Sequence, residues 1–180
     1  QHLFDIDPAQ IHVGVRFRPP CRLTADDFEE IHRCRAARRR GHASCILIPP
    51  EMTRSDLLAS KTAFGLGYRD GENGSLSHAL WINTSNMSTG PYWVAWMAYQ
   101  NTTQLRELLA LLAGMGDQVR VITLCEPPRI MLQDVLENPF REFRVREEGQ
   151  YKLNSRAYSA SQARILDLPK CLAKTHLRCH

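Results

Sequence analysis

The chain has 180 residues, of which 43% are hydrophobic and 23% are charged, and its formal net charge is +4. These proportions are those of an ordinary globular protein, and the length predicts one domain, or one domain with a piece of another. A core of this size needs no disulfide staple. The charge would tolerate an anionic ligand, but it is too small to indicate nucleic-acid binding by itself.

The six cysteines are scattered and form no Cys-x-x-Cys pair, a distribution typical of reduced thiols in a reducing compartment. No apolar run approaches the roughly 18 residues of a membrane span. No basic-then-apolar leader is present either, so we expect a cytoplasmic protein. The chain begins without methionine and stops in "AKTHLRCH", without a finished element. We therefore expect a piece of a longer protein.

Strands and helices alternate in the first half of the sequence. The helix at 24–40 starts with Thr24 and Asp27 in capping-box spacing and carries its arginines on one face. The next helix ends on Gly65-Leu66-Gly67, which reads as a terminator rather than a dinucleotide loop. The predicted elements, in order, are a strand at 12–18 ended by two prolines, a helix at 24–40, a strand at 43–49 and a helix at 53–67.

In the second half, the turn signals Asp70-Gly71 and Asn73-Gly74 precede an alternating strand. Residues 92–100 are apolar almost throughout, which predicts a central strand. A strand, a helix and a second strand then form a crossover unit. The remaining predicted elements are a helix at 102–116, a strand at 118–127, a short helix at 130–138, a charged connector at 139–156 and a lone strand within 157–173. The predicted class is α/β (α+β), with a mixed central sheet flanked by helices.

Arg38, Gly41 and Ala43 match R-x-x-G-x-A, the pyrophosphate fingerprint of acetyl-CoA-binding acetyltransferases. That loop must follow a strand and open a helix, so that free amides point at the phosphates. Here a predicted helix precedes the motif and a predicted strand follows it. We interpret the motif as a basic helix end closed by Gly41.

The turn Gln100-Asn101-Thr102-Thr103 has the right position, after a buried strand and at the head of a helix. Its residues differ from a phosphate loop, because Thr103 and Leu105 carry side chains where the backbone would have to approach the ligand. Asn101 and Gln104 suit a self-contained helix cap instead. We therefore interpret residues 100–103 as a vestigial cofactor-binding turn.

Aromatic side chains gather on the strands before this turn. Plain alternation places Trp93 with Tyr99 on one face, and Tyr92, Val94 and Trp96 on the other. The candidate substrate-binding residues are Trp93, Trp96 and Tyr99, although sheet core is the competing interpretation.

The remaining residues indicate no catalytic or metal site. The histidines, His78 among them, show no ligand spacing. No nucleophile elbow is present, and no serine or cysteine has a recognisable triad context.

Three long stretches, Phe64–Trp81, Gly90–Val119 and Glu126–Arg141, resemble the central region of Eis-type (enhanced intracellular survival) acetyltransferases of the GNAT superfamily. The resemblance extends over residues 38–141. In addition, "QARILDLPKCLAKTHL" resembles the opening strand of that family's sterol-carrier-like domain. Such proteins have a catalytic GNAT domain, then a GNAT-like domain, then a sterol-carrier-like domain.

The resemblance implies a division into a lead-in and first strand (1–23), a GNAT-like domain (24–142), and a connector with the start of a sterol-carrier-like unit (143–180). It implies that acetyl-CoA is bound by the parent protein's first domain and not by this chain. The family's catalytic tyrosine and terminal carboxylate have no counterpart here, so no catalytic residue carries over. The implied partners are the two flanking domains, with a possible homo-oligomer.

Three functions remain open at this stage. The leading hypothesis is a catalytically silent GNAT-like domain that lines the acceptor pocket of an N-acetyltransferase. The second is a self-sufficient acetyltransferase that binds acetyl-CoA at Gln100 despite lacking glycines. The third is a non-enzymatic module whose basic helix binds an acidic partner or, less favoured because no aromatic residues interleave, nucleic acid, through Arg33, Arg35, Arg38, Arg39 and Arg40.

Overall fold

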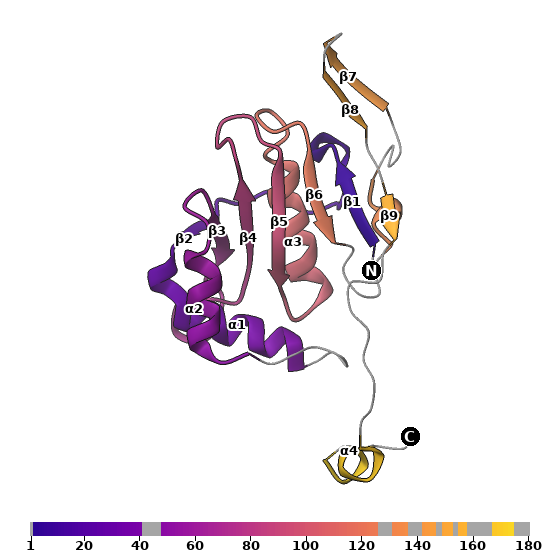
Figure 1. Cartoon of the computed structure of the whole chain (residues 1–180). Coiled ribbons are helices and arrows are strands. Elements are labelled where there is room, and N and C mark those ends of the chain that lie inside the picture. The colour runs from indigo at the N-terminus through magenta and orange to yellow at the C-terminus, as the bar shows by residue number, and fades with distance from the viewer. Residues whose placement is uncertain are drawn as a thin grey trace.

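A mixed seven-stranded sheet forms the centre of the molecule, in the order β2-β3-β4-β5-β6-β1-β9 (Figure 1). The computed structural model describes residues 2–40, 48–125, 131–136, 142–146, 149–152, 155–157 and 167–174. The strands of this sheet are β1 (His2–Ile6), β2 (Cys21–Leu23), β3 (Phe64–Tyr68), β4 (His78–Thr84), β5 (Tyr92–Ala98), β6 (Ile122–Cys125) and β9 (Ser155–Ala157). Strands β5 and β6 are parallel, and the other neighbours are antiparallel.

The helices are α1 (Phe28–Arg40), α2 (Pro50–Leu58), α3 (Thr102–Ala113) and α4 (Leu168–Lys174). Short 3-10 turns lie at Pro8–Gln10, Ala25–Asp27, Glu72–Gly74 and Leu132–Asp134, and β7 (Glu142–Arg146) pairs with β8 (Gly149–Lys152) in a separate hairpin. Within the described residues, no helix combines the length and the apolar character that crossing a bilayer requires.

The sheet has a core on each face. On one face α3 packs against the sheet through buried leucines such as Leu108 and Leu112, which meet Leu80 and Ile82 of β4. On the other face, α1 and α2 pack through Ile31 and Leu57 in a smaller cluster. Figure 1 shows α3 behind the sheet and α1 with α2 in front of its lower part. The prediction of a mixed sheet flanked by helices is confirmed.

The capping signal at the start of α1 is also confirmed. The Asp26 amide donates to the Thr24 hydroxyl, and the Asp27 carboxylate accepts from the Thr24 amide at 2.8 Å. Together these bonds close a capping box. The predicted central position of residues 92–98 is confirmed as well, because β5 lies between β4 and β6.

The strand predicted at 12–18 is wrong. Apart from the bridge of Ile11 to Leu136, this segment joins no strand among the described residues. Gly14 has a φ of +64° and interrupts the extended run. Beyond it, the ring of Phe17 lies against Gly114 at the end of α3. The first strand that does exist, β1, lies between β6 and β9 and has too short a pattern to stand out in the sequence.

The helix predicted at 53–67 is wrong in its second half. Helix α2 ends at Leu58, and the glycines interpreted as a terminator lie inside β3. A Cβ on Gly65 would lie 2.6 Å from the Trp81 ring, and one on Gly67 would lie 2.9 Å from the Cβ of Ala79. The glycines are there because β4 side chains cross over β3 at these points.

Later elements also differ from the prediction. The helix predicted at 130–138 is only the 3-10 turn at Leu132–Asp134 in the part that is described. The predicted connector at 139–156 contains β7 and β8 and the start of β9. Most of the strands predicted at 43–49 and within 157–173 lies outside the described residues. Residues 48 and 49 are described and form no strand, and residues 168–173 lie in α4.

Strand β5 carries one extra residue relative to β4. Ile82 pairs with Val94, whereas the preceding residue Trp81 pairs with Trp96, so Ala95 is bulged out. The bulge exchanges the faces of the residues that follow it. The face assignment from plain alternation is therefore wrong: Trp93 shares a face with Trp96, and Tyr99 lies with Tyr92 and Val94 on the α3 side.

We predict that Gly65→Ala destabilises the protein by about 1–3 kcal/mol, because the added methyl group would overlap the Trp81 ring and the side chain of Leu23. Urea unfolding measures the loss. In a Trp81→Leu background the same substitution should cost less, since the ring is gone. An equal cost in both backgrounds would show that the close approach of β4 is not what requires glycine.

Candidate functional site at the turn between β5 and α3

The turn between β5 and α3 is closed by its own side chains. The Gln104 amide donates to Oδ1 of Asn101 at 3.0 Å, and the Gln100 amide donates to Oε1 of Gln104 at 2.7 Å. The Leu105 amide donates to the Asn101 carbonyl. These are the two side-chain contacts predicted for a self-contained cap, and both are present.

Thr102 and Thr103 form the first turn of α3 and are exposed. Their amides are the ones that the cap leaves to solvent, since no described group accepts from them. The Thr103 side chain stands on this outer surface, while Leu105 points inward and is 2% exposed. A ligand at this helix end would therefore meet two amides with threonine side chains around them.

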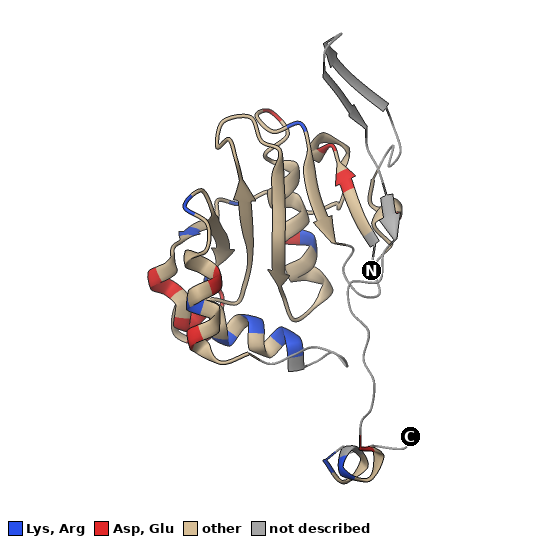
Figure 2. Ribbon diagram, in the orientation of Figure 1, with Lys and Arg blue, Asp and Glu red and all other residues tan. Residues whose placement is uncertain are grey.

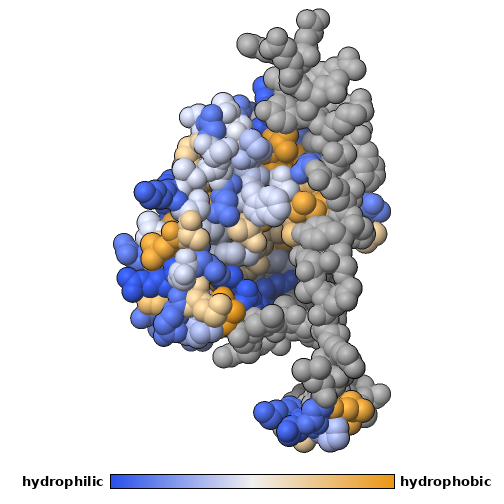
Figure 3. Space-filling model, viewed as in Figure 1, coloured by the Kyte–Doolittle hydropathy of each residue, from blue (hydrophilic) through white to orange (hydrophobic). Residues whose placement is uncertain are grey.

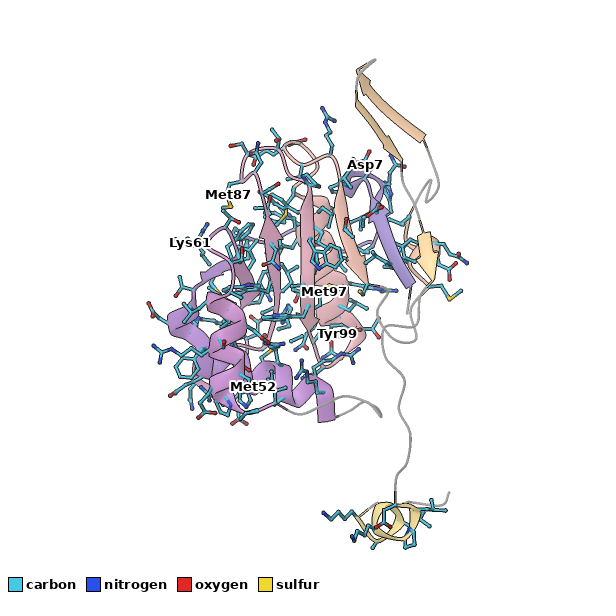
Figure 4. The ribbon with its side chains drawn as sticks, viewed as in Figure 1. Asp7, Met52, Lys61, Met87, Met97 and Tyr99 are labelled. Carbon is cyan, nitrogen blue, oxygen red and sulfur yellow. The ribbon has the colours of Figure 1, made fainter. Side chains whose placement is uncertain are left out.

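The three aromatic candidates are not brought together. Trp93 is 44% exposed. Trp96 is half-buried and stacks on Trp81 with ring centroids 6.2 Å apart. Tyr99 lies at the end of β5 on the opposite face, just before the turn, as Figure 4 shows. Its hydroxyl accepts from Nη2 of Arg38 at 2.7 Å.

A cavity of about 700 Å³ lies beside this turn. Helix α1 forms one wall, the loop between β3 and β4 forms the second, and the start of α3 forms the third. Its rim is mainly polar, and Cys34 and Leu76 are its buried apolar residues. The lining residues are Glu30, Arg33, Cys34, Ala37, Gly71, Glu72, Ser75, Leu76, Ser77, Gln100 and Gln104. Of the predicted site residues, Gln100 alone reaches this cavity.

Two lining groups have defined electrostatic surroundings. Burial raises the pKa of the Cys34 thiol to about 12, so this side chain is an uncharged part of the wall. Glu30 contacts Arg69 and lies 3.9 Å from Arg33, which neutralises its charge. Glu72 is exposed and has no ion pair within the described part of the chain. Glu72 is therefore the lining residue that gives this part of the cavity a negative charge.

The arginines of α1 are spaced along the helix (Figure 2) but are largely engaged within the chain. Arg35 is buried, lies 3.5 Å from Asp56 and stacks over Trp96. Burial lowers the pKa of Arg35, and Arg39 lowers it further. Arg38 is stacked on Tyr99 at 3.9 Å from the ring centroid. The R-x-x-G-x-A match begins inside this helix, and its Gly41 and Ala43 lie outside the described residues.

A polar cluster that the sequence did not reveal lies next to the cavity, on the α3 side of the sheet. Arg18 contacts both oxygens of Asp70 and lies 3.2 Å from Glu107, and Nε2 of His78 is 2.9 Å from the same Glu107 oxygen. Burial lowers the pKa of His78, while Glu107 and Asp70 oppose that effect. The four residues come from four segments, so no local spacing could have indicated them.

We predict that Asn101→Ala destabilises the protein by about 1 kcal/mol, because an N-cap acceptor is lost. Gln104→Ala should cost about 0.5–1 kcal/mol, because the Gln100 amide loses its acceptor. Chemical denaturation of both variants tests this, with Gln118→Ala as the control because that side chain is exposed and remote from the cap. Costs equal to that of the control would mean that the cap does not hold the turn.

No family model and no curated protein matches the sequence. Solved structures do match. A GCN5-related N-acetyltransferase from Kribbella flavida is similar over 86% of this chain, with 15% identity and a TM-score of 0.55. One from Anabaena variabilis is similar over 86%, with 9% identity and a TM-score of 0.56. A probable N-acyltransferase from Enterococcus faecalis is similar over 68%, with 16% identity and a TM-score of 0.54.

At these identities the likeness concerns the fold alone. The aligned part covers 36%, 39% and 31% of those three proteins, so the chain spans about a third of their length. The mixed sheet, the crossover from β5 through α3 to β6 and the helices on both faces are thus those of GCN5-related N-acetyltransferases, and the chain has their fold.

Proposed function

We propose that this chain is a catalytically silent GNAT-like domain of a longer N-acetyltransferase, and that its cavity forms part of the pocket for the acceptor amine. The parent reaction would transfer acetyl from acetyl-CoA to a neutral amine, with a base taking the amine proton and an acid meeting the thiolate. Those groups and the acetyl-CoA site would belong to another domain. The Eis-type resemblance and the partial coverage of the structural neighbours support this assignment.

The observation that carries the proposal is the occupied cap at α3. A helix N-terminus binds phosphate through free amides and through a backbone that the ligand can approach closely. Here the Gln100 and Gln104 amides already donate within the turn. Thr103 adds a branched side chain over the remaining amides. The strongest anion site of this fold is therefore used for the protein's own stability.

The cavity supports the second part of the proposal. Its size suits a small molecule or part of a larger one. Glu72 supplies a carboxylate that attracts a cationic amine, and Gln100 and Gln104 supply side-chain amides beside it. An amine held by hydrogen bonds to such groups would be positioned but not activated, because the buried Cys34 thiol and the paired Glu30 are poor bases.

The two alternative functions have less support. A self-sufficient enzyme would need the cap to open before acetyl-CoA could bind. A basic module would need free arginines, whereas Arg35 and Arg38 are held against Trp96 and Tyr99. In the space-filling view of Figure 3, the surface over α1 and α2 is mostly hydrophilic with some hydrophobic patches, and Figure 2 shows residues of both charges on these helices.

Acetyl-CoA should not bind to this chain at millimolar concentrations in a calorimetric titration, because the cap occupies the Gln100 and Gln104 amides and the two free amides of Thr102 and Thr103 lie among threonine side chains. Thr103→Gly combined with Gln104→Ala frees the Gln100 amide and removes the branched side chain, so this double variant should bind measurably. Leu105 is left unchanged because it is buried. Micromolar binding by the unaltered chain would overturn the proposal in favour of a self-sufficient enzyme.

In the parent enzyme, Glu72→Gln should raise the KM for a polyamine acceptor by about two- to fivefold, with little change in kcat. An exposed charge pair is worth about 0.2–1 kcal/mol, and this one would act on binding alone. Steady-state kinetics at two salt concentrations measure the change, with Glu51→Gln as a control of equal charge on α2. A loss of kcat at an unchanged KM would place Glu72 in the chemistry instead.

A further inference from the structure

The polar cluster beside the cavity offers three potential metal ligands. One carboxylate oxygen each from Asp70 and Glu107 and a ring nitrogen of His78 all lie within 4.8 Å of one another. They come from the loop after β3, the middle of α3 and the first residue of β4. Carboxylate oxygen and imidazole nitrogen are the ligand types that zinc-like cations accept. Proximity alone does not make a site, because exposed acidic groups often cluster.

His78 supplies the second observation. Its side chain is 1% exposed, and within the described part of the chain Nε2 makes no well-directed hydrogen bond, although Oε2 of Glu107 is only 2.9 Å away. The distance is short enough for a hydrogen bond, so the angle between the ring nitrogen and the carboxylate oxygen is what prevents one. A buried ring nitrogen aimed off its nearest acceptor is costly unless something else satisfies it.

The distance between Nε2 of His78 and Oε2 of Glu107, and the fact that these atoms do not point at each other, suit two ligands of one metal ion. Ligand atoms about 2.1 Å from the same zinc, at angles of about 90–110°, lie about 3.0–3.4 Å apart and do not point at each other. The Nε2–Oε2 distance of 2.9 Å is close to the lower limit. The three ligand atoms lie within 4.8 Å of one another, so the widest pair has to close by up to about 1.4–1.8 Å, which the exposed loop position of Asp70 allows.

The other ring nitrogen of His78, Nδ1, already has a hydrogen-bond partner. Nδ1 of His78 lies 2.8 Å from the Ser77 hydroxyl, which donates to the Tyr68 carbonyl at 2.9 Å. Because the Ser77 hydroxyl uses its hydrogen on the Tyr68 carbonyl, it has to accept a hydrogen bond from Nδ1–H of His78. In the neutral ring, the lone pair is then on Nε2. Metal-binding histidines are held in this way by a partner on the second nitrogen.

Arg18 currently balances the two carboxylates. Its guanidinium contacts Asp70 and Glu107, so one positive charge faces two negative ones. Arg18 lies in the segment without regular structure between residues 12 and 20 and is 39% exposed at its side chain. A divalent ion would neutralise the carboxylates fully, and the guanidinium could turn to solvent without unfolding an element.

We propose that Asp70, His78 and Glu107 form a binding site for a divalent transition metal ion such as zinc, for which Arg18 competes as an internal cation. Three protein ligands leave a fourth position for water or for a group reaching in from the neighbouring cavity, which Ser77 also lines. Binding the ion releases Arg18 from the carboxylates. The site is independent of acetyl-CoA and of the acceptor proposal.

Titration of the full chain with zinc and with cobalt tests this directly. We expect one ion per chain, and a cobalt spectrum with visible bands but no thiolate charge-transfer band, because no cysteine is among the ligands. Asp70→Asn and Glu107→Gln should each weaken zinc binding at least tenfold, as should His78→Gln. Arg18→Gln should strengthen it at least threefold, because the competing cation is removed.

Glu51→Gln is the control, an exposed carboxylate on α2 that lies outside both the cluster and the cavity lining, and it should bind zinc as the unaltered chain does. His78 is buried, so a loss of stability would by itself weaken zinc binding in its variant, and the variant of the exposed Asp70 is therefore the decisive comparison. Equal affinity in all variants would mean adventitious binding to thiols or surface groups. The absence of binding by both the unaltered chain and Arg18→Gln would overturn the proposal.

Discussion

The hydrogen bond from the Gln100 amide to the side chain of Gln104 is the constraint on which this account depends. It joins the first residue of the turn to the first turn of α3, and the Gln104 amide in return donates to the Asn101 side chain. The crossover from β5 to β6 is thereby anchored at its start. A helix end that could attract a diphosphate is instead satisfied internally, which has a stabilising effect of about 1–2 kcal/mol.

The bulge at Ala95 determines what surrounds that turn. Without the extra residue, Tyr99 would lie on the same side as Trp93, and Trp96 would join the α3 core. With it, Trp96 stacks between Trp81 and Arg35 on the α1 side, and Tyr99 receives Arg38. The bulge therefore links α1 to the end of β5 through two arginine–aromatic contacts, and it positions α1 as a wall of the cavity.

The elements and caps that depend on residues close together in the sequence could be predicted. The Thr24 capping box, the buried β5 and the closed cap at Asn101 and Gln104 each lie within a few residues, and their chemistry is unambiguous. The bulge could not be predicted, because nothing in "YWVAWMAYQ" marks Ala95 as the residue without a partner. The glycines of β3 were misread because their reason for being small, the crossing of Trp81, lies on another strand.

The polar cluster was missed for the same reason. His78 has no ligand spacing to any neighbour in sequence, and Glu107 reads as an ordinary exposed residue of an amphipathic helix. Only the pairing of β3 with β4 and the packing of α3 across them bring Asp70, His78 and Glu107 together. Long-range contacts of this kind depend on which strands and helices pack together, which residue spacing within one segment does not indicate.

Amide hydrogen exchange at the turn tests the central claim most directly. If side chains close the start of α3, the amides of Gln100 and Gln104 exchange slowly in the native protein, while those of Thr102 and Thr103 exchange close to the rate of an unstructured peptide. Coenzyme A added in excess then leaves all four rates unchanged. Rapid exchange at Gln100 that coenzyme A suppresses would contradict the account, because the turn would then be open and able to bind the cofactor.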